Sequence, residues 1–228
     1  MHAHKQRQVL HFQVRGMEHE MKIINASYHV ETPIDGAEIL KRIEKAGRTC
    51  YKSEDRITDE SATSFVQKLI ERGHESVLEH ESITVRFVCD RGISHEIVRH
   101  RIASFSQEST RYCNYSNDRF GSEITFIKPC FLKEGTVAYV LWFTAMHLAN
   151  IMYSDMLAEG CTPQEARSVL PNSTKTEVVM TANLREWRHF LKLRTAKAAH
   201  PQMQELTVPL LHELQERIPV VFDDIGEG

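Results

Sequence analysis

The sequence has no excess of charge of either sign. Among its 228 residues, 28 are Lys or Arg and 31 are Asp or Glu, which gives a net charge of −3 with neutral histidines. A chain with this balance has no overall basic field to attract nucleic acid, and no acidic tail. Any site for an anion must therefore be local and built from a few cationic side chains.

Closely spaced cysteines are also absent. The five cysteines stand far apart in the sequence, at Cys50, Cys89, Cys113, Cys130 and Cys161. No pair has the spacing of a zinc knuckle or of a redox C-x-x-C motif, so we expect no metal site. An odd number of scattered cysteines, without an apolar signal segment at the start, is typical of a reduced, cytoplasmic protein. We expect most of the cysteines to fill the core.

One long stretch lacks charge altogether. The twenty residues from Gly135 to Ser154 contain no Asp, Glu, Lys or Arg, and this length is about enough to span a bilayer. However, Thr144, His147, Asn150 and Ser154 recur at helical spacing and form a polar stripe along one face. The pattern therefore predicts a central helix, packed in the core or against another subunit, and no membrane span.

Repeats, linkers and low-complexity tracts are missing as well. Residues 21–228 therefore read as one domain, and the 41% of hydrophobic residues in the chain are enough to build its core. Residues 1–20 are polar and contain four histidines at irregular spacing. We interpret them as an N-terminal extension or a remnant of cloning, in preference to a metal-binding arm.

The periodicity of the remaining sequence predicts an α+β fold, in which helices pack around a small, mostly antiparallel sheet. Alternating residues predict strands at 21–30, 82–89, 123–129 and 176–182. Helical spacing predicts helices around 39–43, at 65–70, after residue 90, from about residue 134, from residue 162, at 185–194 and at 201–217. We expect Thr58 to cap the second helix and Gly73 to end it, Asp90 to cap the third, and a capping box to open at Thr162.

Cationic and hydroxyl side chains are concentrated in RHRIASFSQESTRYCNYS, residues 99–116. If the preceding DRGISHEIV and these first residues form one helix, Arg99 and Arg101 point about 200° apart. They then either complement the negative end of the helix dipole or reach two different anionic groups. The hydroxyl residues that follow are Ser104, Ser106, Ser109 and Thr110. Together with Arg111 they predict a phosphate-binding cradle in a turn after the helix.

The order Arg99-His100-Arg101, seven further residues and then Ser109 resembles the signature of flavin-dependent thymidylate synthases. The flanking residues that strengthen the resemblance are Ser104, Arg111 and Tyr112. Three other segments extend it: GHESVLEH at 73–80, EARSVLP at 165–171 and ANLREWRHFLKLR at 182–194. The likeness thus covers most of the chain from about Met21 onward.

The resemblance implies an enzyme whose subunits form a homotetramer with shared active sites, and in which residues 21–228 are the catalytic domain. The implied reaction is the reductive methylation of dUMP to dTMP. Methylenetetrahydrofolate is the carbon donor, and FAD reduced by NADPH is the hydride carrier. The implied partners are therefore dUMP, folate, NADPH and further copies of the chain, without nucleic acid, membrane or metal.

The resemblance also assigns roles to individual residues. The implied cofactor-binding residues are His74, Ser76, Glu79, Arg99, His100, Arg101, Ile102, Asn183, Arg185 and His189. His189 stands where the resemblance leads us to expect Asn. The implied dUMP-binding residues are Glu96, Gln107, Glu108, Ser109, Thr110, Arg111, Arg167 and Arg194.

Three of these residues are expected to be catalytic. The resemblance places His74 near the reactive ring of the flavin, and Arg194 near the uracil carbonyl, where a fixed cation stabilises developing charge. A serine without an adjacent base ionises too weakly to attack uracil. We therefore expect Ser109 to position or polarise dUMP, without a covalent bond between enzyme and uracil.

Two alternatives are consistent with the same residues. One is a nucleotide methyltransferase in which a Cys113 thiolate, favoured by nearby Arg111, attacks the substrate. The other is an RNA-binding module that uses the cations and aromatic rings of Arg99, Arg101, Arg111, Tyr112 and Tyr115. The acidic net charge and the absence of a wider basic stripe count against the RNA-binding module.

Overall fold

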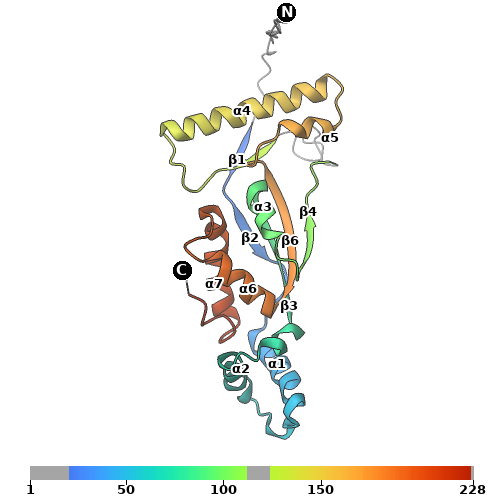
Figure 1. The fold of residues 1–228 in the computed structure, drawn as a ribbon, viewed down its shortest axis with the longest axis vertical. Helices are drawn as coiled ribbons and strands as arrows, with labels where there is room; N and C mark the ends of the chain where they lie inside the picture. The colour runs from blue at the N-terminus through green and yellow to red at the C-terminus, as the bar shows by residue number, and fades with distance from the viewer. Residues whose placement is uncertain (1–20, 112–123, 227–228) are drawn as a thin grey trace, which may run out of the picture.

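The computed structural model describes residues 21–111 and 124–226. The interpretation of residues 1–20 and the hypotheses on Tyr112, Cys113 and Tyr115 lie outside the described residues. Figure 1 shows an elongated arrangement, with a long helix across one end, a sheet in the middle and a pair of helices at the other end.

A four-stranded antiparallel sheet with the order β2-β3-β6-β4 forms the centre of the molecule. Its strands are β2 (Ser27–Val30), β3 (Ser82–Asp90), β4 (Ser104–Gln107) and β6 (Lys175–Asn183). Strands β3 and β6 pair along their whole length, from Ser82 opposite Asn183 to Asp90 opposite Lys175. The alternation of β3 is confirmed, because Ile83, Val85 and Phe87 are all buried in the main core.

Helices α3 (Arg91–Ile97), α6 (Leu184–Arg194) and α7 (Pro201–Arg217) contribute their apolar sides to the same core as the sheet. The ring of Trp187 lies against those of Phe87 and Phe190, with centroids 6.3 and 5.4 Å away. Its indole N–H donates to the carbonyl of Ile83 at 3.0 Å. This buried hydrogen bond and the aromatic contacts fix α6 on β3.

Helices α1 (Gly36–Tyr51) and α2 (Ser61–Glu71) form the end of the molecule below the sheet in Figure 1. The short 3₁₀ helix η1 (Glu54–Arg56) connects them, and a second one, η2 (Glu75–His80), follows α2. Gly73 has a positive φ of 72° and ends α2 as predicted. The predicted cap at Thr58 is wrong: α2 begins after Glu60, and the Thr58 N–H instead donates to the hydroxyl of Ser61.

The predicted strand at 21–30 is two strands, which belong to different sheets. Strand β1 (Lys22–Ile24) pairs in parallel with β5 (Thr125–Ile127), whereas β2 pairs with β3. An alternating pattern reports which side chains are buried but not which strand is the partner, so it continues unbroken across the change of sheet.

Helix α4 (Val137–Ala158) lies across the end of the molecule next to β1 and β5, followed by α5 (Pro163–Ala166) and the 3₁₀ helix η4 (Arg167–Val169). The capping box at Thr162 is confirmed, with the Glu165 carboxylate accepting from the Thr162 N–H at 2.8 Å. Within this chain α4 is not central, because Leu141 is 66% exposed and other apolar side chains of α4 are exposed too. Among the described residues, no helix is both long and apolar enough to cross a membrane.

Candidate active site

The Arg-His-Arg segment leaves the helix that precedes it. The Asp90 carboxylate accepts from the Ile93 N–H at 2.7 Å and caps α3 as predicted, but α3 ends at Ile97. The N–H groups of Arg99 and His100 then bond three residues back, to the carbonyls of Glu96 and Ile97. The assumption of a continuous helix through Arg101 is therefore wrong. Bonds of this i→i+3 type tighten the last turn and redirect the chain toward β4.

This turn forms one wall of a cavity of about 1030 Å³. The other walls are the η2 turn and the exposed face of α6, which comes from the opposite half of the sequence. The residues that line it are Glu75, Glu79, Arg99, His100, Arg101, Ile102, Asn183, Arg185, Glu186, Arg188, His189, Lys192, Leu193 and Arg194. Most of the residues predicted to bind the cofactor are in this set. His74 and Ser76 do not line the cavity but belong to the turn that forms its edge.

The lining of this cavity carries more positive than negative charge. Six Arg or Lys side chains stand against three Glu side chains among its lining residues. Two ion pairs form within the lining, because Arg185 donates to Glu79 at 2.6 Å and Arg188 donates to Glu75 at 3.0 Å. The exposed side chain of Ile102, which is 72% accessible, adds an apolar surface next to the cations. The guanidinium groups of arginine bind phosphate groups well, and an apolar surface suits a flat ring. The cavity therefore fits a large ligand that carries both phosphate groups and a flat ring.

A chain of hydrogen bonds crosses the floor of the cavity. The His100 Nδ1 lies 3.2 Å from the Glu186 Oε1, and its Nε2 accepts from the Arg194 Nε–H at 3.1 Å. Burial, followed by the charge of Arg194, lowers the pKa of His100 to about 4. The imidazole is therefore neutral at pH 7, and its contact with Glu186 is a hydrogen bond between a neutral ring and a carboxyl group.

The donor atoms of His100, Glu186 and His189 all lie within 4.8 Å of one another, as a metal site would require. Both ring nitrogens of His100 are already engaged by Glu186 and Arg194. The excess of cationic side chains in the same cavity also opposes a dication. The cluster thus suits hydrogen bonding better than metal coordination, and the expectation that the chain holds no metal stays a prediction.

His74 has a partner that the sequence did not suggest. The hydroxyl of Tyr51 lies 3.2 Å from the His74 Nδ1, although Tyr51 is the last residue of α1 and is 56% exposed. If the hydroxyl donates, the other ring nitrogen of His74 carries the proton. Nothing in the local periodicity of α1 pointed to this contact.

The residues predicted to bind dUMP form a second group, on β4 and just after it. The Gln107 amide donates to the Ser94 hydroxyl at 2.9 Å, and Glu108 accepts from the Lys175 ammonium at 3.0 Å. Ser109 follows the end of β4, and its hydroxyl accepts from the Arg111 N–H at 3.3 Å. Lys175 was missed by the sequence analysis, since it appears only as the first residue of a strand.

Arg167 joins this second group from α5 and η4. Its Nη1 donates to the hydroxyl of Thr110 at 3.4 Å, and the Arg111 Nε donates to Gln164 at 3.2 Å. The predicted cradle in a turn is partly wrong, because Ser104 and Ser106 lie in strand β4 with exposed side chains. Strand pairing with β6 takes precedence there, because it satisfies the backbone groups of the segment.

Arg194 connects the two groups. Its Nη1 donates to the Glu96 carboxylate at 2.8 Å and its Nη2 to the Glu96 carbonyl at 3.1 Å. Glu96 is one of the predicted dUMP-binding residues, whereas His100, on the other side of Arg194, is one of the predicted flavin-binding residues. The structure therefore brings the two predicted sets together at this guanidinium.

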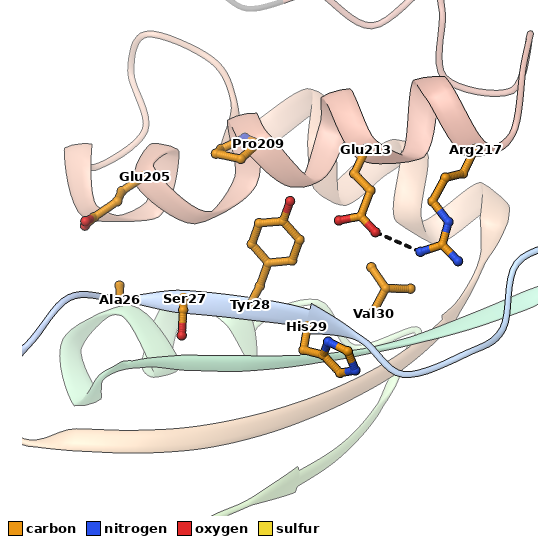
Figure 2. A pocket seen from close by; sticks show the side chains of 9 residues that line it. All are labelled: Ala26, Ser27, Tyr28, His29, Val30, Glu205, Pro209, Glu213 and Arg217. Carbon is orange, nitrogen blue, oxygen red and sulfur yellow. Dashed lines mark hydrogen bonds and ion pairs between the residues drawn. The ribbon is translucent and has the colours of Figure 1, made fainter.

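A second, smaller cavity of about 470 Å³ lies between β2 and α7, as Figure 2 shows. The carboxylate of Glu213 pairs with Arg217 at 2.7 Å, and the Tyr28 ring lies between the strand and the helix. Burial, together with Glu213, raises the pKa of Tyr28 to about 12. None of the residues singled out from the sequence lines this cavity, so the larger one is the candidate active site.

The larger cavity, with its cations and apolar surface, is suited to a large anionic ligand, and it lies beside a second, polar group of residues. A family model described as thymidylate synthase complementing protein matches residues 34–220. The flavin-dependent thymidylate synthase of Geobacter sulfurreducens is 33% identical over 190 residues, which cover 80% of each chain. That of Corynebacterium efficiens is 35% identical over 220 residues, or 87% of this chain and 84% of the relative. The chain belongs to the flavin-dependent thymidylate synthase family, as its sequence motifs predicted.

A solved structure supports the fold. The crystal structure of thymidylate synthase X from Helicobacter pylori, with FAD and dUMP, matches with a TM-score of 0.69 and 23% sequence identity. The match covers 88% of this chain and 98% of the Helicobacter chain. The predicted α+β fold is thereby confirmed. Membership of the family favours the flavin-dependent enzyme over the cysteine methyltransferase and the RNA-binding module.

Proposed function

We propose that this protein converts dUMP to dTMP, with methylenetetrahydrofolate as the carbon donor and NADPH as the source of reducing equivalents. The observation that carries the proposal is the cationic cavity of about 1030 Å³, where three separate motif segments meet. The redox chemistry of the reaction is that of bound FAD. The protein supplies binding, orientation and electrostatic stabilisation.

The lining of the cavity supports FAD as the ligand. Arg99, Arg101 and Lys192 offer donors for a diphosphate, and none of these three side chains is buried. Ile102 and Leu193, which are both exposed, offer apolar surface for a ring system. In this proposal Asn183, Arg185, His189 and the η2 residues Ser76 and Glu79 complete the cofactor site. His74, at the start of the η2 turn, stands next to the reactive ring.

The second polar group supports an anionic nucleotide. Arg167 and Arg111 are next to the hydroxyl groups of Thr110 and Ser109, which is a donor set suited to a phosphate. We assign Arg194 to the uracil carbonyl, where its fixed charge stabilises the negative charge that develops as C5 becomes nucleophilic. The remaining residues of the dUMP site in this proposal are Glu96, Gln107 and Glu108.

Exposed apolar side chains on α4 support self-association, which we propose yields a homotetramer with active sites shared between subunits. Val137, Val140, Leu141, Phe143 and Leu148 are all exposed on this one helix. Apolar groups in such number on one element are typical of an interface. We further propose a cytoplasmic location, because the described cysteines are all free thiols.

One experiment tests the proposed function directly. The purified protein, loaded with FAD, should show a visible flavin band that bleaches with NADPH and recovers in air. With dUMP and methylenetetrahydrofolate added, dTMP should appear and be measurable by chromatography. A protein that takes up no FAD, or that forms no dTMP when fully loaded, would refute the proposal.

A further inference from the structure

Glu186 reaches Arg194 through a single intervening side chain. Glu186 and Arg194 stand at opposite ends of α6, and His100 lies between them with only 6% of its surface exposed. The distances are 3.2 Å from Glu186 Oε1 to His100 Nδ1 and 3.1 Å from His100 Nε2 to Arg194 Nε. The Phe190 ring packs edge to face on His100, with centroids 4.8 Å apart, and so limits rotation of the imidazole.

The contact with Arg194 determines which ring nitrogen of His100 carries the proton. A guanidinium has five N–H donors and no acceptor, so the His100 Nε2 must present its lone pair to Arg194. The proton of the neutral ring is then on Nδ1, and it faces the Glu186 carboxyl oxygen. Glu186 is therefore the acceptor that stabilises this tautomer. In the other tautomer, two N–H groups would face each other between His100 and Arg194.

The far side of the Arg194 guanidinium is fixed by Glu96. Nη1 donates to its carboxylate and Nη2 to its backbone carbonyl, so three nitrogens of the same guanidinium have partners. A planar group bonded at three nitrogens has little freedom to rotate. The orientation of Arg194 thus depends on His100 from one side and on Glu96 from the other.

We propose that Glu186 is a positioning residue for Arg194, which acts by holding His100 in the tautomer with the proton on Nδ1. The hydrogen-bonded chain from Glu186 through His100 to Arg194 thus couples the cofactor cavity, which Glu186 lines, to the nucleotide site, where Arg194 acts. This inference rests on the proposed function for its catalytic consequence, but the tautomer itself can be observed without any reaction.

A double-mutant cycle tests the catalytic consequence on the FAD-loaded enzyme. In Glu186→Ala, kcat/KM for dUMP should fall by roughly 10-fold to 100-fold, the effect of losing one hydrogen bond to a charged site. Flavin reduction by NADPH without nucleotide should fall by a smaller factor than kcat/KM for dUMP, because the lost contact acts through His100 on Arg194. Glu186→Gln should recover most of the loss, because the amide oxygen can still accept from Nδ1–H.

The cycle is completed with Arg194→Lys, because lysine lacks the planar guanidinium that donates to His100 and Glu96. In that background, Glu186→Ala should cost less than about threefold further, since the residue on which it acts is already altered. Losses that simply multiply would overturn the proposal. Glu44→Gln is the matched control: its buried carboxylate bonds to Arg48 and Ser61, outside the cavity, and the change should not alter the ratio of the two rates.

Nitrogen-15 NMR of the histidine side chains tests the tautomer directly. The resonances of His100, identified by their loss in His100→Gln, should report the proton on Nδ1 in the wild-type protein and a shift toward Nε2 in Glu186→Ala. A wild-type ring with its proton on Nε2 would overturn the inference, whatever the activity. A wild-type protein that forms no dTMP would refute the proposed function and leave this measurement valid.

Discussion

The guanidinium of Arg188 donates two hydrogen bonds to the carboxylate of Glu75, at 3.2 and 3.0 Å. Arg188 lies on α6 with its side chain 1% exposed, and Glu75 is the first residue of η2, next to His74. On its other side the same guanidinium bonds to Asp224 and to the Val221 carbonyl. One buried cation therefore ties three parts of the chain together: the turn of His74, helix α6 and the C-terminal segment.

Replacing Arg188 by Met should destabilise the protein strongly. The substitution removes the buried guanidinium that bonds to Glu75, Asp224 and the Val221 carbonyl. Because both carboxylates are partly exposed and Asp224 keeps Lys192 at 3.4 Å, we expect a loss of about 2–3 kcal/mol. Urea unfolding monitored by circular dichroism measures the loss. Arg188→Lys keeps the charge but not the fork, so its loss should be smaller. Equal stability of Arg188→Met and the wild type would contradict the structural role of this cluster.

The stability of the protein should depend on pH through His100. Its pKa is lowered to about 4 in the folded state, against an ordinary value of 6.5, so between these values the unfolded chain binds a proton that the folded protein does not. The contribution of His100 to the free energy of unfolding is therefore fully present above pH 6.5. It is lost as the pH falls toward 4, by up to about 3 kcal/mol. Burial raises the pKa of Glu186, which works in the opposite direction and offsets part of this loss.

Urea unfolding at pH 7 and at pH 4.5 measures this dependence. His100→Gln serves as the reference, because glutamine does not titrate and its amide can form hydrogen bonds in the same place. The wild type should lose more stability than His100→Gln over this interval. The same loss in both proteins would show that other groups cause it.

Local patterns predicted most elements of this fold but missed strand β4, whose residues were assigned to a turn. The helix at 201–217 begins and ends at the predicted residues, and Asp90 and the Thr162 box cap their helices as expected, because caps and spacing depend on neighbouring residues. The division of residues 21–30 between two sheets was not predictable, since the choice of partner strand depends on distant segments.

The same limit applies to the site. The motif residues that line the larger cavity could be named from the sequence, but their contacts could not. Arg188 and Glu75 are 113 residues apart, and Arg194 and His100 are 94 apart. No periodicity relates residues at such separations. From the sequence alone, Arg188 cannot be distinguished from the exposed cations of the same helix.

Arg99→Ala and His74→Ala should each weaken FAD retention without loss of fold. Arg99 is an exposed cation at the cavity wall, and His74 begins the η2 turn, so neither change opens a cavity in the core. The flavin content per protomer after gel filtration, read from the visible spectrum, measures the effect. Where a phosphate contact is lost, the affinity for FAD should fall by about tenfold or more. Arg56→Ala, an exposed arginine of η1 outside the cavity, is the control. Full flavin content in both variants would refute the assignments.

Arg194→Ala should separate the two half-reactions. Its proposed partner is dUMP, so nucleotide-dependent turnover should fall by roughly 100-fold or more, the usual cost of a group that stabilises developing charge. Reduction of the flavin by NADPH alone should change far less. Stopped-flow absorbance measures the reductive step and chromatography measures dTMP. An equal loss in both steps would show that Arg194 serves the cofactor instead.

Ser109 should be dispensable as a nucleophile. Its hydroxyl accepts from the Arg111 backbone N–H at 3.3 Å, and the Arg167 guanidinium donates to the hydroxyl of the next residue, Thr110, an arrangement suited to positioning a bound anion. We therefore expect Ser109→Ala to be slower by roughly 10-fold to 100-fold, yet measurably active, because one donor to the substrate is lost and no bond-forming atom is removed.

The cysteines provide the matching test of covalent catalysis. Replacing all five by serine should spare dTMP formation, provided that circular dichroism shows the fold to be intact. Burial raises the pKa of Cys89 to about 12, which keeps this thiol protonated and unreactive. Mass spectrometry of enzyme denatured during turnover with dUMP should find the unmodified protein mass. An adduct of the nucleotide on Ser109 or on Cys113 would establish a covalent mechanism and refute the positioning role of Ser109.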